Sequence, residues 1–433
     1  MGANVRPYRQ VGLNRRRNYD RVAWRIYVWA FGVRAIAGLS AYVLTLLIAT
    51  PFLEDALWYE YMGYNVASAW LTGGQGGLDT LSEHGQAVWV MVATIAVLYF
   101  VMGGVRAIPV LLILYSAVTA LVPVYSYFIG RELGMTDAAA RRAGWLVALS
   151  PAFVFWSGSL YKEGMILLAL NLATYHTLRL QSRWQGRSLV LLVVSVGALF
   201  GLRFYIAAMM ALVIVAGLLF VRSSKSANAP RGAGTPGLVR QVIVAVMFVG
   251  AVSSLSLHER AERQLTETRE GILMEVDRTR HWSAISAESG YYPDADLGTL
   301  GEAAQFFPIG LFYFLTVPLP WQTGALRQNL IIPETAFWLL VLYPFTVIGL
   351  IRGFRVNRPG TMVCILATAG MCVIYALLSG NIGIAYRMRS QVWLLWAPFA
   401  AWGWEMRREQ RRERRRFARR ARPGPAMAQP VVR

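Results

Sequence analysis

Long apolar runs without a charged residue constrain this chain more than any other feature of its sequence. One runs from Ile36 to Phe52, and similar runs recur as far as Val392–Trp404. A helix of about 20 apolar residues covers the roughly 30 Å hydrocarbon core of a bilayer. Because every backbone polar group in lipid must find a partner within the protein, these runs predict an all-α, polytopic transmembrane bundle of about eleven helices.

The composition excludes several other classes of protein. Hydrophobic residues make up 56% of the 433 residues and charged residues only 15%, whereas about a quarter of a typical soluble domain is charged. The net charge of +20 does not indicate a nucleic-acid ligand, because the basic residues are confined to short segments between apolar runs. The two cysteines, Cys364 and Cys372, lie within one apolar run and are interpreted as reduced packing residues.

The charge on each loop predicts the side of the membrane that it faces. The arginine-rich start and tail are both expected in the cytoplasm, beneath the inner (plasma) membrane. The predicted divisions are a cytoplasmic N-terminus (1–30), a first transmembrane module (31–221) with an outer loop (51–86), a cytoplasmic loop (222–238), a second transmembrane module (239–404) with an outer loop (257–335), and a cytoplasmic tail (405–433).

One of the apolar runs in the first half of the chain is predicted not to cross the membrane. Six apolar runs lie between residues 87 and 221, but the number of crossings between the first outer loop and the basic inner loop must be odd. We expect the run Ala138–Trp156, which is short and broken by a proline, to enter from the outside and return without crossing. This prediction places Lys162, Glu163 and Arg203 on the outer side.

Two adjacent acidic residues, Glu54 and Asp55, follow the first predicted span. Leu57, Tyr61 and Tyr64 then share one face of a helix, which predicts an amphipathic helix in the membrane interface. Ionisable groups at the mouth of a transmembrane helix are costly and are therefore functional hypotheses. The pair can equally well cap the amphipathic helix through its dipole. Residue types alone leave both interpretations open.

Two arginines stand where the positive-inside rule disfavours them. The outer segment Ser379–Arg389, between the last two predicted spans, carries Arg387 and Arg389. Guanidinium groups bind phosphate through paired hydrogen bonds, so the pair indicates an anionic ligand; the alternative is that both side chains reach up to lipid headgroups. Further candidates for the phosphate, with an anchoring role as the alternative, are Lys162 and Arg203 beside Tyr205.

The remaining motifs restrict the ligands. The segment Phe306–Trp321 contains three prolines and is predicted not to cross; it forms either one wall of a groove for an isoprenoid chain or a packed lid. The four histidines lack metal-ligand spacing, so the sequence requires no cofactor, while a divalent metal on the acidic pair is left open. No glycine loop of the phosphate-binding kind occurs, which argues against a nucleotide-sugar donor.

The first outer loop resembles that of the GT-C superfamily of membrane glycosyltransferases, which includes the protein O-mannosyltransferases and the bacterial aminoarabinose transferase. The acidic pair, the following Tyr59 and an amphipathic stretch ending in glycine carry this likeness. It extends over about Ile36–Leu180, and the motif Tyr386–Arg389 is similar to an Arg-Tyr motif before the last span of the family. Further matching segments are Tyr127, Ile129–Glu132, Ala139–Arg142, Leu149–Pro151 and Leu160–Glu163.

The resemblance implies an inverting transfer of a sugar from a polyprenyl-phosphate donor to a glycan, lipid or protein acceptor on the outer face. Asp55, beside Glu54, matches the general base, and Glu163 matches a second acid that orients the acceptor. The substrate-binding candidates are Tyr59, Lys162, Arg203, Tyr205, Tyr386, Arg387 and Arg389. The alternatives are a glycan ligase or polymerase, and a transporter of lipid-linked saccharides. The early position of the acids argues against the former, and charge-free apolar runs argue against the latter.

Overall fold

The computed structural model describes residues 8–48, 53–73, 88–183, 185–219, 271–322, 324 and 326–420. The predicted loop 222–238, the predicted span Val239–Leu255 and the first part of the second outer loop lie outside the described residues. Within them the chain forms helices joined by short loops, with one isolated β-bridge between Gly290 and Asn381, and this confirms the predicted all-α fold.

The described helices are α1 (Tyr8–Leu47), α2 (Glu54–Thr72), α4 (Trp89–Val101), α5 (Ile108–Thr119), α6 (Leu121–Glu132), α7 (Asp137–Leu149), α8 (Pro151–Gly158), α9 (Lys162–Ser182), α10 (Gly186–Phe200), α11 (Phe204–Leu219), α14 (Ile272–Ile285), α15 (Leu300–Thr316), α16 (Leu326–Phe337), the π-helix η1 (Trp338–Leu342), α17 (Tyr343–Val356), α18 (Arg358–Leu378) and α19 (Ile382–Arg420).

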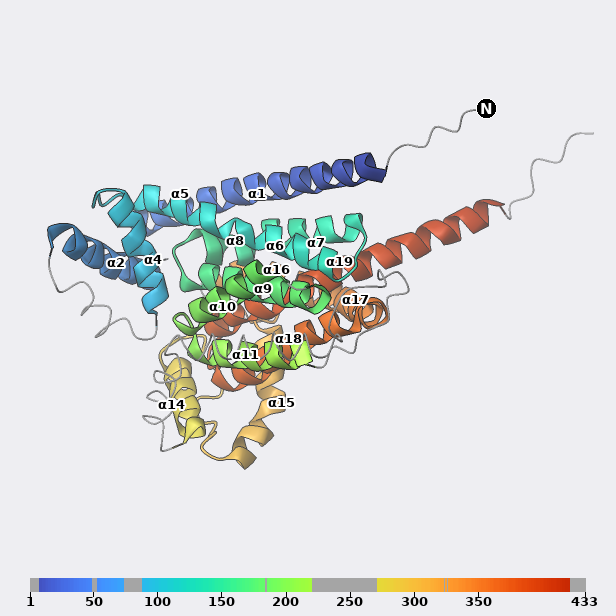
Figure 1. Cartoon of the computed structure of the whole chain (residues 1–433). Helices are drawn as coiled ribbons and strands as arrows, with labels where there is room; N and C mark the ends of the chain where they lie inside the picture. Colours follow the sequence, from blue (N-terminus) through green and yellow to red (C-terminus); the bar gives the residue numbers. More distant parts are fainter. Residues whose placement is uncertain are drawn as a thin grey trace, which may run out of the picture.

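Four stretches of helix in the described residues are long and apolar enough to cross a membrane: Arg21–Leu47, Ile108–Glu132, Gln328–Val356 and Arg358–Leu378. Large apolar side chains on them are exposed, as expected of a lipid-facing surface; Ile36, for example, is 68% exposed. The fold is therefore that of a membrane protein. Helix α1 begins and helix α19 ends at one end of the bundle, on the right in Figure 1, which we call the terminal end; the opposite end is the distal end.

Helix α4 corrects the prediction that residues 87–103 span the membrane. Its 13 residues extend over only about 20 Å. At its start the Val90 amide donates to the carbonyl of Gly201, and just beyond its end Arg106 donates two hydrogen bonds, of 2.9 and 2.7 Å, to Glu60 of α2. Tyr99 adds a third hydrogen bond to the same carboxylate. Helices α2 and α4 therefore pack against each other at the distal end (Figure 1), and α4 does not cross the bundle.

Helices α7 and α8 correct the complementary prediction that Ala138–Trp156 returns to the outer side. Helix α7 begins next to the end of α6, where Arg131 pairs with Asp137, and its Arg142 pairs with Glu405 of α19. Helix α8 ends at Gly158, which packs on α1 far from those contacts. Together α7 and α8 run from the terminal end to the distal end. That the number of membrane crossings before residue 220 is odd stays a prediction.

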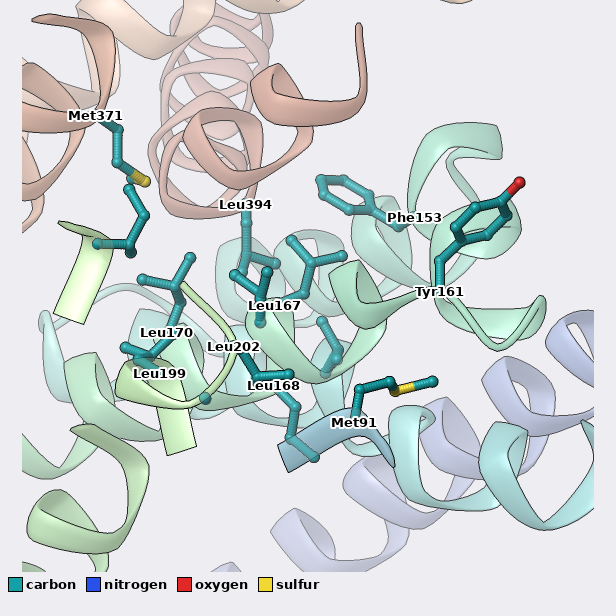
Figure 2. Close-up of a cluster of buried hydrophobic side chains, with 14 of the residues drawn as sticks. Met91, Phe153, Tyr161, Leu167, Leu168, Leu170, Leu199, Leu202, Met371 and Leu394 are labelled. Carbon is teal, nitrogen blue, oxygen red and sulfur yellow. The ribbon is translucent and has the colours of Figure 1, made fainter. Parts of the chain in front are cut away.

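A cluster of buried apolar side chains surrounds α9 and fixes its position (Figure 2). Leu167, Leu168 and Leu170 of α9 lie at its centre. Around them pack Met91 of α4, Phe153 of α8, Leu199 of α10, Met371 of α18 and Leu394 of α19. Burying a leucine side chain of this size contributes about 1.5–3 kcal/mol, so the start of α9 is held rigidly at the distal end.

The proline-containing segment near residue 306 is more regular than its sequence predicts. Helix α15 includes Pro308 and continues to Thr316. It packs on the distal part of α18, where a Cβ on Gly310 would lie 2.4 Å from the carbonyl oxygen of Ala376. This close approach requires glycine, and it places the end of α15 beside the start of α19.

Candidate functional site

Charged residues from four separate segments meet at the distal end. Asp55 lies in the first turn of α2, Glu163 in the first turn of α9, Arg203 before α11 and Arg387 in the second turn of α19. Arg387 donates a hydrogen bond of 2.7 Å to Asp55 and forms an ion pair with Glu163, with Nε and Oε1 2.6 Å apart. Arg203 donates a hydrogen bond of 2.7 Å to the same Glu163 oxygen. The structure thus brings together residues that lie up to 332 positions apart.

Exposure increases steadily across this cluster. The side chain of Glu163 is 0% exposed and that of Arg203 is 5% exposed, whereas Arg387 reaches 17% and Asp55 reaches 48%. Glu163 and Arg203 therefore form a buried base for the cluster. Arg387 connects this base to Asp55, which faces the solvent.

Burial and neighbouring charges shift the pKa values of Lys162 and Glu163. These two residues begin α9 and precede its apolar part. Burial alone raises the pKa of Glu163, but Arg387 and Arg203 outweigh burial and lower the pKa to about 2. Glu163 is therefore ionised at neutral pH and accepts protons poorly. Burial, followed by the charge of Arg203, lowers the pKa of Lys162 to about 8. Burial, followed by the charge of Glu163, raises the pKa of Tyr59, which keeps its phenol protonated.

Two aromatic rings complete the surroundings of Arg387. Its guanidinium carbon lies 5.2 Å from the centroid of the Tyr161 ring and 5.6 Å from that of Trp156. A cation over a ring at this distance gains about 0.5–1 kcal/mol or more, and the rings restrict the directions in which the guanidinium can move. Arg387 is held by two carboxylates and two rings.

A cavity of about 980 Å³ opens beside the cluster, and both Asp55 and Arg387 lie on its wall. Its lining is largely apolar, with polar groups at a few positions, which is the usual character of a small-molecule site. The apolar part of the lining comes from Phe155, Trp156, Leu330, Ile331, Ile382 and Ile384. Glu288, Ser289, Tyr291, Gln322 and Gln328 add polar side chains to the lining.

The other candidates from the sequence lie in different places. Tyr386 lines the cavity and donates a hydrogen bond of 2.5 Å to Glu334. Tyr205 lies one layer behind the cluster, with its ring 6.4 Å from that of Tyr375. Tyr59 is buried at 5% exposure. The side chain of Glu54 lies outside the described residues.

Arg389 is turned away from Arg387. Residues two positions apart do not face the same side of a helix. Arg389 is fully buried, and it donates hydrogen bonds to the carbonyl oxygens of Leu315, at 3.0 Å, and of Val317. These carbonyls close the end of α15, so Arg389 joins α15 to α19 and does not line the cavity with Arg387.

Several residues of the site were missed by sequence reasoning. Glu334 is one of them, although a lone acid among apolar residues was a usable signal. Trp156 and Tyr161 looked like ordinary interface aromatics, because only the folded chain shows the cation between them. Glu60 and Arg106 fix α2 on α4 and hence the place of Asp55. Among the described residues no group of three or more metal-ligating side chains occurs, and a metal on the acidic pair stays a prediction.

Fold and site together define a helical membrane protein with an ionised cluster beside a large cavity at one end. No protein-family model matches the sequence, and no curated protein matches it. Among solved structures, the chain is similar to the archaeal oligosaccharyltransferase AglB from Archaeoglobus fulgidus, in complex with an inhibitory peptide and a dolichol-phosphate. The identity is 14% and the TM-score 0.41, over 92% of this chain and 53% of that one. This chain therefore spans about half the length of that protein.

Proposed function

We propose that this protein is an integral membrane glycosyltransferase that moves a sugar from a polyprenyl-phosphate donor to an acceptor at the distal end of the bundle. The observation that carries the proposal is the contact between Asp55 and Arg387 on the wall of one cavity. A carboxylate that can accept a proton and a guanidinium that can receive a phosphate lie within reach of the same bound molecule.

Asp55 acts as the general base in this scheme. It takes the proton of an acceptor hydroxyl while the hydroxyl oxygen forms a bond to the anomeric carbon, which typically accelerates a reaction by about 10² to 10⁴. The bond between the anomeric carbon and the donor phosphate breaks on the opposite face, and its electron pair stays on the phosphate oxygen. One displacement of this kind inverts the configuration.

The leaving phosphate departs as an anion, so it needs positive charge and no proton. Arg387 supplies that charge at the cavity wall, with Arg203 and Lys162 behind it. Glu163, ionised and buried, holds both arginines in place and does not take part in proton transfer. Phe155, Leu330 and Ile331 offer apolar surface for the isoprene units nearest the phosphate.

The distribution of charge supports the orientation in the membrane. The arginine-rich start of α1 and the arginine-rich end of α19 both lie at the terminal end (Figure 1). By the positive-inside rule the terminal end faces the cytoplasm. The cavity then opens on the outer side of the plasma membrane, where lipid-linked sugars reach glycan, lipid or protein acceptors.

A deletion strain tests the proposal directly. Mass spectrometry of its lipids and surface glycans is expected to show an accumulated polyprenyl-phosphate sugar and the loss of the corresponding sugar from a glycan. Wild-type protein restores both, and the Asp55→Asn variant restores neither. Unchanged lipid and glycan pools in the deletion strain contradict the proposal.

Purified protein separates transfer from transport. In detergent, where no compartments exist, a transferase still converts the donor to polyprenyl phosphate and product, whereas a transporter produces no chemical change. Transfer of a whole oligosaccharide, in place of one sugar, would favour a glycan ligase.

A further inference from the structure

The break between α7 and α8 leaves backbone groups without their helical partners. Ser150 is extended, with φ −66° and ψ 128°, and Pro151 has no N–H to donate to the carbonyl of Val147. Each unpaired backbone group at membrane depth is costly. Arg34 of α1 satisfies the carbonyls, because its guanidinium donates to the oxygens of Val147 and Ala148, each at 3.3 Å.

Glu334 satisfies the opposite side of the same break. Its carboxylate accepts a hydrogen bond of 2.9 Å from the amide of Ala152, and another from the hydroxyl of Ser150. It also accepts the hydrogen bond of 2.5 Å from Tyr386. One carboxylate, only 7% exposed, thus joins the start of α8, helix α16 and the start of α19.

The segments that Glu334 joins carry residues next to Arg387. Helix α8 carries Trp156, whose ring lies under the guanidinium of Arg387, and Tyr386 is the residue directly before Arg387. The rings of Trp156 and Tyr386 are themselves 6.3 Å apart. Glu334 therefore connects the backbone that carries the ring to the helix that carries the guanidinium. It does not lie on the cavity wall itself.

We propose that Glu334 is a positioning residue for the phosphate-binding site. By holding the α7–α8 break and Tyr386 together, it sets Arg387 at the place and angle that a donor phosphate requires. The inference rests on the proposed function, because it assigns to Glu334 an effect on a phosphate ligand. A purely structural role would lower stability and leave the affinity for phosphate unchanged.

The test measures binding of farnesyl phosphate to the purified full-length protein in detergent. In Glu334→Gln the amide nitrogen replaces one of the two oxygens. At the Oε1 position it removes the acceptor of Ser150, and at the Oε2 position it removes the acceptor of both Ala152 and Tyr386. We expect binding to weaken about three- to tenfold, the usual effect of one lost hydrogen bond. Ser150→Ala removes a single donor outside the cavity wall and is expected to weaken binding in the same direction. If Glu334→Gln fails to fold, Ser150→Ala still tests the proposal.

Glu405→Gln is the matched control. Glu405 is also 7% exposed, but it pairs with Arg142 at the terminal end. We expect a comparable loss of melting temperature in Glu405→Gln and Glu334→Gln, with weaker binding only in the latter. Because Ser150 acts through Glu334, the double variant that combines Ser150→Ala with Glu334→Gln is expected to bind farnesyl phosphate no more weakly than Glu334→Gln alone.

The outcomes separate the inference from the function on which it rests. Equal farnesyl phosphate affinities in Glu334→Gln and Glu405→Gln overturn the positioning role. If Arg387→Gln weakens binding while Glu334→Gln does not, only the inference fails. If wild type and Arg387→Gln bind equally, or neither binds, the phosphate site is absent and both proposals fail.

Discussion

The contact between Asp55 and Arg387 predicts that the general base and the donor phosphate compete for one guanidinium. Asp55 accepts a hydrogen bond of 2.7 Å from Arg387. A phosphate that binds the Nη1 group of Arg387 competes with this carboxylate for the same hydrogen bond. Replacing Asp55 by Asn keeps the shape of the side chain and removes its charge. Asp55→Asn is therefore expected to abolish transfer and, at the same time, to bind a lipid phosphate more tightly than wild type.

The structure sets the size of the expected gain. The Asp55 side chain is 48% exposed, so the ion pair is screened by solvent. Pairs of this kind contribute about 0.2–1 kcal/mol, which corresponds to a gain in phosphate affinity of about 1.4- to fivefold. Loss of the base is expected to reduce turnover by about 10² to 10⁴. The two effects have opposite signs, and a general disturbance of the site produces only losses.

The assay titrates farnesyl phosphate into wild type, Asp55→Asn and Glu288→Gln, at low and at high salt. Glu288 is an exposed residue on the same cavity wall, so Glu288→Gln removes the same charge farther from Arg387. We expect a larger gain for Asp55→Asn than for Glu288→Gln, and a smaller difference at high salt. Equal or weaker binding by Asp55→Asn refutes the competition, and retained transfer refutes the role of Asp55 as base.

Three further predictions concern the buried part of the site. The pKa of Glu163 is lowered from 4.5 to about 2, so the stabilisation by its charge is complete above pH 4.5 and is lost as the pH falls toward 2. The melting temperature in detergent should therefore fall more steeply with decreasing pH in wild type than in Glu163→Gln. The pKa of Lys162 is lowered from 10.5 to about 8, so stability should rise between pH 8 and 10.5 in wild type, and this rise should be absent in Lys162→Met. Arg389→Gln should lower the melting temperature without changing farnesyl phosphate affinity, whereas Arg387→Gln should weaken binding; equal effects on binding would contradict the different directions of the two side chains.

The sequence predicted the all-α fold because the length and apolar character of a membrane helix are physical necessities. Which apolar runs cross the membrane was harder to predict. An odd number of crossings requires only that one of the six runs between residues 87 and 221 does not cross, and it does not say which one. Residues 87–103 and Ala138–Trp156 are both short, and the second contains the proline. The deciding contacts are tertiary. Arg34 and Glu334 satisfy the backbone at the proline, which permits a crossing, while Glu60 holds α4 at the distal end.

The same reasoning explains which charged residues could be found. Asp55 and Arg387 were singled out because each violates a local rule, an acid at the mouth of a predicted span and an arginine on the predicted outer side. Arg389 violates the same rule as Arg387. Its different direction follows from helix geometry, once the helix is known to begin at Ile382 and not after Arg389. A lone acid among apolar residues marks Glu334 as a candidate, but the local sequence does not indicate its partners, because Ser150 and Tyr386 lie 184 and 52 positions away.

The two carboxylates that contact Arg387, those of Glu163 and Asp55, differ in burial and therefore in the roles that they can have. Glu163 is fully buried between two guanidinium groups, and its lowered pKa keeps it charged at any physiological pH. Removing such a charge leaves its buried partners uncompensated, at a cost of about 3–5 kcal/mol, so Glu163 is best suited to holding the site together. Asp55 shares Arg387 but is half exposed on the cavity wall. Asp55 is therefore better placed than Glu163 to exchange its partner for a bound phosphate, and the proposed function assigns the role of general base to Asp55.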